Sequence, residues 1–369
     1  MKKICVVTGT RAEYGLLSPL MTEIEKTEDF ILSTVVTGMH LSPEFGLTYK
    51  EIEKDGFQID EKIEMLLSAD TPGSILKSMG IELIGFADFF GRTQIDMVVL
   101  LGDRYESFVA ASAALVFGIP IAHIHGGEST EGAIDEAFRH SITKMSGLHF
   151  TATEAYRKRV IQLGEQPDTV FHVGSLGIEK MKKTRLLPRK EIESFVGMNL
   201  QKTTLMVTYH PVTTEGNTAE KQMKNLLQAL DEYPDCNIIF TKANADAGGR
   251  IINRLIDEYV EQNSNRCKAF ISMGQIRYWS ALSYCAMAIG NSSSGIIEVP
   301  SFQIPTVNVG DRQKGRICAE SVIHCGTETE QICEAVQKAF LYVGNYREKE
   351  IVNPYEGIQP VRMIMSEIS

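Results

Sequence analysis

Hydrophobic and polar positions alternate between two kinds of segment along this chain. Short runs rich in valine, isoleucine and leucine predict strands, and longer segments with apolar residues three or four positions apart predict helices. Continuously apolar strands that alternate with helices are typical of a parallel sheet covered on both faces. The sequence therefore predicts an α/β protein.

The pattern occurs twice. In the first half we expect strands near 3–8, 31–37, 95–102, 119–124, 148–152 and 169–173, and helices near 13–27, 71–91, 105–117, 133–146 and 153–164. In the second half we expect strands near 203–209, 236–241, 268–271, 285–289, 304–308 and 321–324, and a last helix near 355–368.

Two doubly wound, Rossmann-like domains follow from this repetition. We expect the first at 1–175 and the second at 176–351, with a linker within 174–190, where glycines, a basic cluster and Pro188 occur. The segment 352–369 is expected to pack back on the first domain. The length of 369 residues suits two domains of roughly 150–200 residues each.

Composition excludes several classes of protein. The formal net charge of −10 argues against a nucleic-acid binder. No segment has the ~18 uninterrupted apolar residues of a membrane span, and the first apolar run is too short for a signal peptide. The seven cysteines are an odd number without a C-x-x-C motif, which indicates reduced thiols and a cytoplasmic protein.

Ligands of doubly wound sheets bind beyond the carboxyl ends of the strands, so two facing domains predict a cleft there. After the first strand, "TGTRAEYG" places Arg11 at a helix start whose free N–H groups favour an anion, although no dinucleotide or P-loop fingerprint is present. After the third strand, "LLGDRYE" releases Asp103 and Arg104 together. A helix-capping aspartate beside a surface arginine is the alternative interpretation of that pair.

"HIHGGESTEGAIDEAFRH" follows the fourth strand. Its double glycine lets the backbone approach a ligand closely beside Glu128. His123 and His125 alternate on an extended segment and so point in opposite directions, and we expect one of them to be a core histidine. The absence of H-E-x-x-H and of a cysteine pair argues against zinc.

A helix is predicted from about 133 onward. Its expected buried face is Ile134, Phe138, Ile142 and Met145. Asp135 and Glu136 then lie in its first turn, where the helix dipole stabilises negative charge. Asp135 and Arg139 are four residues apart and can form an ion pair on the helix surface.

The strand ends of the second domain are polar too. His210 precedes Pro211, which favours an extended backbone, and is expected to face the opposite domain. Asn291–Gly295 opens a helix with three serines, a neutral cradle for an anion, and Glu298 is placed one turn later to accept two ribose hydroxyls. "GDRQKGR" adds Arg312, Lys314 and Arg316 near the same mouth.

Together, "TGTRAEYG", "GDRYE", "HIHGGE", "DEAFRHSITKMS", "HPVTTE", "NADAGG", "GNSSSGIIEVPS" and "GDRQKGR" resemble the hydrolysing UDP-N-acetylglucosamine 2-epimerases. The resemblance runs from about residue 3 to 325 and is strongest to the bacterial branch of sialic acid and legionaminic acid biosynthesis. It implies the GT-B architecture, with UDP-sugar in the cleft between two Rossmann-like domains. It also implies conversion of UDP-N-acetylglucosamine and water to N-acetylmannosamine and UDP, through anti elimination to a 2-acetamidoglucal and its hydration.

The resemblance implies roles for individual residues. Asp103, Glu128 and Asp135 are the expected catalytic carboxylates, and His210 contacts the diphosphate or assists its departure. The animal-type branch has glutamate where this chain has His125, so His125 or Glu128 is expected to take that role. The expected substrate-binding residues are Arg11, Arg104, Glu136, Arg139, Asn244, Asp246, Ser292, Ser293, Ser294, Glu298 and Arg312. No metal or cofactor is expected, and the chain is expected to form a homodimer or homotetramer.

Several alternatives remain at this stage. One is the hydrolysing 2-epimerase of UDP-2,4-diacetamido-2,4,6-trideoxyglucose (UDP-N,N'-diacetylbacillosamine), whose substrate differs at C4 and C6. A non-hydrolysing epimerase, which returns UDP to the glycal, is another. A GT-B glycosyltransferase shares the fold but needs an acceptor groove, and a UDP-sugar sensor without catalytic activity is the non-enzyme alternative.

Overall fold

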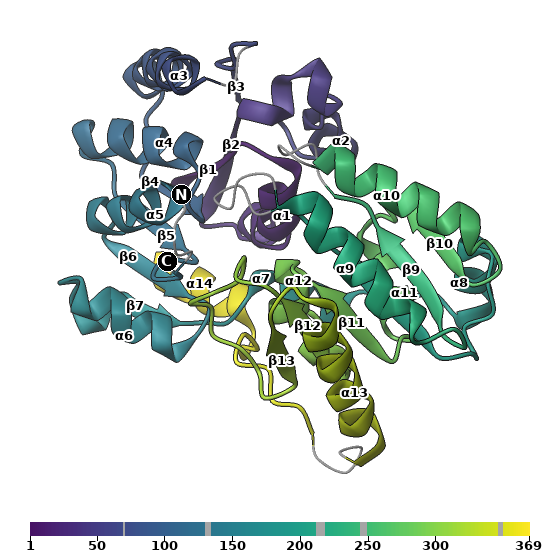
Figure 1. The fold of residues 1–369 in the computed structure, drawn as a ribbon. Helices are drawn as coiled ribbons and strands as arrows, with labels where there is room; N and C mark the ends of the chain where they lie inside the picture. The colour runs from purple at the N-terminus through teal and green to yellow at the C-terminus, as the bar shows by residue number, and fades with distance from the viewer. Residues whose placement is uncertain (69–70, 130–133, 212–217, 244–248, 346–349) are drawn as a thin grey trace. The chain divides into compact units, whose positions relative to one another are not determined.

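The structure is a computed structural model that describes residues 1–68, 71–129, 134–211, 218–243, 249–345 and 350–369. It divides into two compact units, each described by itself. Unit 1 is Met1–Lys180 with Tyr355–Ser369, and unit 2 is Met181–Pro354 (Figure 1). The chain leaves unit 1 five residues later than the expected boundary at 175 and returns three residues after 352.

Unit 1 contains a seven-stranded parallel sheet in the order β3-β2-β1-β4-β5-β6-β7. Its strands are β1 (Lys2–Thr8), β2 (Phe30–Thr37), β3 (Glu61–Ile63), β4 (Met97–Leu101), β5 (Ile121–Ile124), β6 (Leu148–Thr151) and β7 (Val170–His172). Six of them lie where the apolar runs predict them. β3 was missed because its three residues, Glu-Lys-Ile, offer no apolar run.

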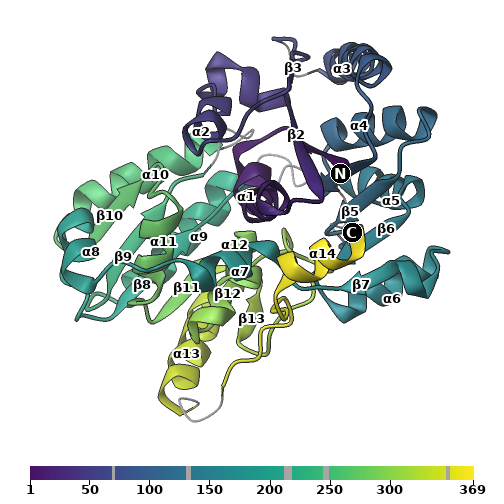
Figure 2. The ribbon, with the colours of Figure 1, turned by 180° about the vertical axis from the view of Figure 1, so that it is seen from behind.

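Helices cover both faces of this sheet (Figures 1 and 2). They are α1 (Arg11–Lys26), α2 (Tyr49–Lys54), α3 (Pro72–Arg92), α4 (Tyr105–Val116), α5 (Ile134–Met145), α6 (Glu154–Gln162), α7 (Leu176–Lys183) and α14 (Pro360–Ile368), with short 3-10 turns at Gly38–Leu41, Pro43–Phe45 and Pro167–Thr169.

Alternation along β1 shows how the strand serves two cores, because successive side chains of a strand point to opposite faces. Ile4 and Val6 pack in a cluster with α1 and α14, whereas Cys5 and Val7 pack in a second cluster with α3 and α4. Each residue from Ile4 to Val7 is therefore apolar, which is the continuous run that the sequence displays.

The C-terminal segment belongs to the first of these clusters. Val361, Ile364 and Ile368 of α14 are buried there with α1, and Figure 2 shows α14 near α1. The amide of Val361 donates to the carboxylate of Glu179 at 2.8 Å, and the chain enters this segment where Ser175 N–H donates to Tyr355 O at 2.8 Å. The helix begins at Pro360 rather than near 355.

Unit 2 contains a six-stranded parallel sheet in the order β10-β9-β8-β11-β12-β13. Its strands are β8 (Thr204–Thr208), β9 (Asn237–Thr241), β10 (Cys267–Phe270), β11 (Met287–Gly290), β12 (Thr306–Val309) and β13 (Val322–Cys325). Its helices are α8 (Arg189–Val196), α9 (Ala219–Asp231), α10 (Gly249–Gln262), α11 (Gln275–Leu282), α12 (Ser293–Ile297) and α13 (Thr329–Asn345), with a 3-10 turn at Val299–Phe302. All six predicted strands are present.

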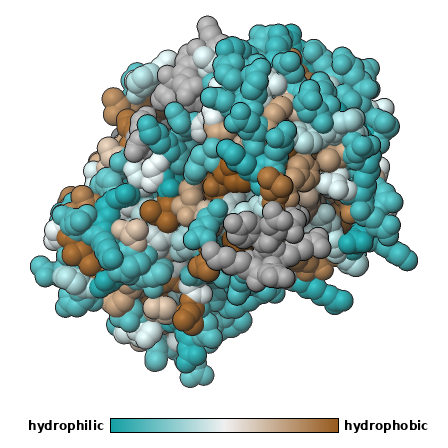
Figure 3. All heavy atoms as spheres, turned by 60° about the horizontal axis from the view of Figure 1, so that its bottom comes forward, coloured by the Kyte–Doolittle hydropathy of each residue, from teal (hydrophilic) through white to brown (hydrophobic). Residues whose placement is uncertain are grey.

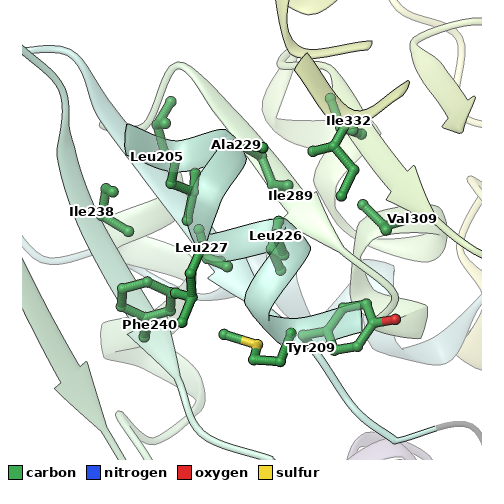
Figure 4. Close-up of a cluster of buried hydrophobic side chains, with 14 of the residues drawn as sticks. Leu205, Tyr209, Leu226, Leu227, Ala229, Ile238, Phe240, Ile289, Val309 and Ile332 are labelled. Carbon is green, nitrogen blue, oxygen red and sulfur yellow. The ribbon is translucent and has the colours of Figure 1, made fainter. Parts of the chain in front are cut away.

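The larger core of unit 2 lies under α9, α10 and α13 (Figure 4). Leu205, Ile238 and Phe240 project from the strands into it, and Leu226 of α9 meets them. The opposite face of the same sheet is covered by α8 and α11, where Met206 is buried in a separate cluster. Both units thus have the Rossmann-like arrangement that the sequence pattern predicts.

The boundary between the two units, after Lys180, lies within the expected linker 174–190, although this segment is not an irregular stretch of chain. Most of it is helical, since it contains α7 and the first residues of α8. Its glycines mark close packing rather than freedom: a Cβ on Gly177 would lie 2.8 Å from Leu16 Cδ2, and one on Gly174 would lie 2.4 Å from the backbone of Gly357.

Within the described ranges, no helix combines the length and the apolar character needed to cross a membrane. On the face drawn in Figure 3, hydrophilic residues predominate and the hydrophobic ones lie among them in small groups. All seven cysteines are free thiols, four of them buried.

Replacing Gly357 should loosen the C-terminal segment. A Cβ at this position would lie 1.7 Å from the carbonyl oxygen of Val173, so Gly357→Ala must displace the segment from the end of β7. We expect a loss of about 1–3 kcal/mol, measured as a lower urea midpoint, and faster proteolysis before α14. Gly147→Ala is the control, because nothing lies within 4 Å of its added Cβ. Equal midpoints for the two variants would contradict this packing.

Candidate active site

The carboxyl ends of β1, β4 and β5, which are neighbours in the sheet, bring polar residues to one edge of unit 1. We call this the unit 1 edge: Gly9–Arg11 after β1, Asp103 and Arg104 after β4, and His125–Glu128 after β5. Because all three strands run in parallel, segments about 115 residues apart in the chain come together here. The sequence predicted that these polar residues lie at the carboxyl ends of strands, and the order β1-β4-β5 makes the three strand ends neighbours.

Arg139 of α5 joins two of these strand ends. Its guanidinium is 3% exposed, and its Nη2 donates to the carboxylate of Asp103 while its Nη1 donates to the carbonyl oxygen of Glu128 at 2.7 Å. A buried cation is stable only when it is paired and hydrogen-bonded, and these two contacts supply both requirements. Arg139 is therefore a buried link between Asp103 and Glu128 rather than part of a surface pair with Asp135.

His125 has an uncommon backbone conformation. Its φ is 64°, a region that few non-glycine residues occupy, and its N–H donates to Phe150 O at 2.8 Å just beyond the end of β5. Its Nδ1 lies 3.9 Å from Oε1 of Glu128, and both side chains are largely buried. The turn thus directs a histidine and a carboxylate toward each other.

The double glycine is required by packing. Gly127 has a φ of +76°, and a Cβ on it would lie 2.6 Å from the carbonyl oxygen of Tyr156. Arg159 Nη1 donates to Gly127 O at 2.7 Å and holds the turn from α6. The close approach at Gly127 is therefore to the protein's own α6.

His123 is the core histidine, as expected. It is fully buried, with its Nε2 2.7 Å from Gly102 O and its Nδ1 3.1 Å from the hydroxyl of Thr143. Burial lowers the pKa of His123 to about 3, so the ring is neutral at physiological pH. It supports the Gly102 turn that precedes Asp103.

The predicted buried face of α5 is partly wrong. Ile134 is 72% exposed, whereas Arg139, Ile142 and Thr143 are buried. The charged Arg139 takes an inward position that hydrophobicity alone assigns to apolar residues. In the first turn, Glu136 accepts from the hydroxyl of Ser129 at 3.1 Å, and Asp135 lies in the same turn, half-buried.

Arg11 is the first residue of α1, as predicted, but the N–H groups beside it are already engaged. The carboxylate of Glu13 accepts from the N–H groups of Gly9 and Thr10 at 2.8 and 3.0 Å, which completes a capping box with Thr10. Arg11 itself pairs with Glu51 at 2.9 Å in an exposed position. The loop after β1 therefore offers an anion fewer free donors than the sequence suggests.

Three buried glutamates under this edge were missed. We call Glu13, Glu82 and Glu106 the buried acid cluster; their exposed fractions are 7%, 0% and 1%. Burial, with the charge of Glu106 second, raises the pKa of Glu13 to about 7 and that of Glu82 to about 9. Glu13 has a local signal, the capping-box spacing after Thr10, whereas Glu82 and Glu106 lie within helices where no local pattern marks them as buried.

The second candidate edge lies in unit 2, where β8 and β11 are neighbours. The side-chain amide of Asn291 accepts from His210 N–H at 2.7 Å and donates to His210 O at 2.8 Å. The carbonyl oxygen of Asn291 accepts from Arg312 Nη1 at 3.1 Å and from Gln313 Nε2 at 3.0 Å. One buried asparagine thus brings together His210, Ser292 and Arg312, all of which the sequence selected.

The serine-rich stretch forms the start of α12. Ser292 is its N-cap and accepts from Ser294 N–H at 3.4 Å, and Ser293 is its first residue. Ser294 donates to the carboxylate of Glu298, which also accepts from Trp279 Nε1 at 3.0 Å. Burial raises the pKa of the Glu298 carboxyl. Both carboxylate oxygens of Glu298 therefore accept hydrogen bonds from residues of unit 2. The sequence analysis expected them to accept hydrogen bonds from two ribose hydroxyls.

Asn244 and Asp246 lie outside the described residues, so the structure places neither. In the described part of the chain, His, Cys, Asp and Glu side chains form no group of three or more suited to hold a metal ion.

Each unit is Rossmann-like and carries acidic, basic and hydroxyl side chains at the carboxyl ends of its strands. The chain is therefore an α/β protein of the GT-B fold. Comparison with known proteins identifies the family: the model described as UDP-N-acetylglucosamine 2-epimerase matches residues 22–369. The chain belongs to this family.

Curated relatives cover most of the chain. It is 46% identical over 337 residues to the GDP/UDP-N,N'-diacetylbacillosamine 2-epimerase (hydrolyzing) of Campylobacter jejuni, covering 91% of this chain and 87% of that protein. It is 43% identical to the polysialic acid biosynthesis protein P7 of Escherichia coli, with coverages of 91% and 85%. It is 37% identical to the UDP-N,N'-diacetylbacillosamine 2-epimerase (hydrolyzing) of Legionella pneumophila, with coverages of 92% and 89%.

Among solved structures, the UDP-GlcNAc 2-epimerase of Neisseria meningitidis bound to UDP-GlcNAc matches with a TM-score of 0.83 over 99% of both chains at 19% identity. This likeness confirms the predicted fold.

Glu82→Gln should flatten the dependence of stability on pH. Burial raises the pKa of Glu82 from its ordinary value of 4.5 to about 9, so the folded protein keeps this proton where the unfolded chain loses it. Its contribution to stability is full below pH 4.5 and is lost as pH rises through about 9. The unfolding free energy of the wild type should therefore fall across this window more steeply than that of Glu82→Gln. Parallel curves from urea denaturation at several pH values would contradict a raised pKa.

Proposed function

We propose that this protein is a hydrolysing 2-epimerase of a UDP-linked 2-acetamido sugar. The observation that carries the proposal is the convergence of Asp103, His125 and Glu128 at the unit 1 edge, with buried Arg139 joining two of them. The hydrolysing relatives support the same reaction class.

The first half-reaction is an elimination. A base removes the proton from C2 while the C1–O bond breaks, UDP leaves with the bonding electrons, and a 2-acetamidoglucal results. Because C2–H is weakly acidic, positive charge must build on the ring as the bond breaks, and nearby carboxylates stabilise it. Asp103, held ionised by Arg139, suits this electrostatic role, and the His125–Glu128 pair suits proton transfer.

The second half-reaction is hydration. Water adds its hydroxide to C1, and a proton returns to C2 from the opposite face, which inverts that centre and frees the 2-epimeric sugar. Two proton transfers on opposite faces of one ring require at least two acid–base groups. Asp135 in the first turn of α5 is the proposed second group, and Glu136 and Arg104 complete the sugar-binding set with Arg139.

The unit 2 edge is proposed to bind the nucleotide. His210 and Arg312, both held by Asn291, supply a histidine and a guanidinium for the diphosphate. Ser292, Ser293 and Ser294 supply hydroxyls, and Glu298 shapes this region through Trp279. Arg11, Asn244 and Asp246 are retained as proposed nucleotide contacts on sequence grounds.

Two substrates are candidates. The Legionella pneumophila relative is named for UDP-N,N'-diacetylbacillosamine, and the Campylobacter jejuni relative is named for the GDP- or UDP-linked form of the same sugar. This sugar is the precursor proposed for the legionaminic acid route. The Escherichia coli relative is named for polysialic acid biosynthesis, and a Neisseria meningitidis relative at 32% identity is named UDP-N-acetylglucosamine 2-epimerase, which supports the sialic acid route. The seven free thiols accord with a cytoplasmic location.

Product analysis in deuterated water tests the reaction. Each UDP-sugar is incubated separately, and we expect free 2-epimeric sugar carrying deuterium at C2, together with UDP, from one of them. Accumulation of a UDP-linked epimer would indicate the non-hydrolysing reaction, and no turnover of either substrate would contradict the proposal. The ratio of the two kcat/KM values decides the substrate.

Variants at the two edges should affect different steps: a variant at the unit 1 edge should lower turnover, and one at the edge of unit 2 should weaken nucleotide binding. Glu128→Gln keeps the shape of the side chain but cannot exchange a proton, so kcat should fall about 10²-fold or more while UDP affinity persists. Ser293→Ala should weaken UDP binding in calorimetry. The exposed Asp168→Asn is the matched control and should change neither. Near wild-type turnover in Glu128→Gln would remove this carboxylate from the chemistry.

A second copy of the chain is the proposed partner of α3 and the end of α4. Exposed apolar side chains gather on these two packed helices: Ile75, Leu76, Ile81, Leu83, Ile84, Leu115, Val116 and Phe117. Phe117 contacts Phe90 of α3 at 5.8 Å between ring centroids, so the two helices present one apolar surface. Contiguous apolar surface of this kind is typical of an interface.

Placing charge on this surface should yield monomers. Ile84 and Val116 are 65% and 84% exposed, so Ile84→Glu with Val116→Asp should leave each unit folded while preventing association. Sedimentation velocity measures the result. Leu341→Glu, at a 63% exposed position of α13, is the control and should keep the wild-type mass. An unchanged mass in the double variant, or a monomeric wild type, would exclude this interface.

A further inference from the structure

We propose that Glu106 is the positioning residue for the Arg104 guanidinium at the unit 1 edge, and that Glu82 beside it is a neutral carboxylic acid in the folded protein. The catalytic relevance of this arrangement rests on the proposed function, in which Arg104 contacts the sugar. All of these residues belong to unit 1.

The contact between the Arg104 guanidinium and the Glu106 carboxylate is bidentate. Nε of Arg104 donates to Oε2 of Glu106 at 3.0 Å, and Nη2 donates to Oε1 at 2.7 Å. The Glu106 side chain is 1% exposed and that of Arg104 is 33% exposed, so the pair has a buried end and an accessible end. A bidentate pair fixes the plane of the guanidinium as well as its position. The remaining guanidinium surface therefore faces outward in a set orientation.

Two glycines make the slot that holds Glu106. A Cβ on Gly38, whose φ is +56°, would lie 2.8 Å from Oε1 of Glu106, and a Cβ on Gly9 would lie 3.4 Å from its Cβ and Cγ. Gly9 follows β1 and Gly38 follows β2, so the ends of two neighbouring strands enclose this carboxylate. No larger residue fits at Gly38 without displacing the Glu106 carboxylate. The slot is thus built around this side chain.

Hydrogen counting points to a proton on Glu82. The hydroxyl of Thr37 lies 3.0 Å from Ile63 O and 3.0 Å from Oε1 of Glu82, yet a hydroxyl carries a single hydrogen. A carbonyl oxygen can only accept, so both contacts are satisfied when Thr37 donates to Ile63 and Glu82 donates to Thr37. In the described part of the chain, Oε2 of Glu82 has no hydrogen-bond partner. An ionised carboxylate in that position would be costly.

Charge balance supports the same assignment. Arg104 is the cation whose charge acts on both Glu13 and Glu82, and it is already paired with Glu106. A second ionised carboxylate nearby would repel Glu106 and compete for the guanidinium. The raised pKa of Glu82, about 9, has burial as its first cause and the charge of Glu106 as its second. A neutral Glu82 therefore leaves Glu106 as the carboxylate that holds Arg104.

The matched variants Glu106→Gln and Glu82→Gln test this inference, since each replaces a carboxyl by an amide of the same shape. Glu106→Gln removes a charge, so kcat/KM should fall about 10-fold or more, carried mainly by KM for the UDP-sugar. Glu82→Gln replaces one neutral group by another, so kcat/KM should stay within about twofold of wild type. Arg104→Ala is the reference for complete loss of the guanidinium.

Infrared spectroscopy supplies a readout that a merely structural role would not move. At pH 8 the wild-type-minus-Glu82→Gln difference spectrum should contain the carbonyl band of a protonated carboxylic acid, whereas the wild-type-minus-Glu106→Gln difference spectrum should not contain it. If Glu106→Gln does not fold, Glu106→Asp, which is one methylene shorter, should give an intermediate KM in its place.

The outcomes separate the two proposals. Loss of activity in Arg104→Ala with wild-type kinetics in Glu106→Gln would overturn the positioning role. Wild-type kinetics in Arg104→Ala would overturn it as well, while product analysis in deuterated water would still judge the overall reaction independently. Equal losses in Glu82→Gln and Glu106→Gln, or a wild-type-minus-Glu82→Gln difference spectrum without a carboxylic acid band, would overturn the neutral acid.

Discussion

Each unit depends on one constraint: its strands are all parallel and buried on both faces. Side chains along such strands must be apolar, as β1 illustrates, where Ile4 and Cys5 serve opposite cores. Polar chemistry is therefore confined to the strand ends, and parallel direction collects those ends at one edge. The distant segments that carry Asp103 and Glu128 meet for this reason, without any contact that the local sequence would reveal.

A buried cation then fixes the positions of these strand ends relative to each other. Arg139 approaches from α5 and bonds the Asp103 carboxylate and the Glu128 backbone, so three elements share one guanidinium. Asn291 does the same in unit 2 with neutral groups, since its amide holds both backbone groups of His210 and its carbonyl holds Arg312. Buried polar groups of this kind are costly unless every contact is made, which favours a single arrangement of each edge.

The strands could be predicted because burial on both faces requires a continuous run of apolar residues, which is visible in the sequence. β3 was not predicted because its three residues, at the margin of the sheet, form no such run. Among site residues, those directly after a strand, such as Asp103 and His210, were found from their position. Glu82 and Glu106 were not, because their partners are fixed by tertiary packing: the slot around Glu106 is made by Gly9 and Gly38, which the sequence separates from it by more than 60 residues.

Environment rather than residue type decides what each acid at the unit 1 edge can do. Asp103 pairs with the guanidinium of Arg139, and Glu106 pairs with that of Arg104. Glu82 has a hydroxyl as its hydrogen-bond partner, and burial raises the pKa of its carboxyl to about 9 despite the charge of Arg104. Glu128 lies 3.9 Å from a histidine, the one type of side chain that ordinarily exchanges a proton near neutral pH. The proposed roles follow from these surroundings: the carboxyl group beside His125 exchanges a proton during turnover, Asp103 and Glu106 keep their arginine partners, and Glu82 stays neutral.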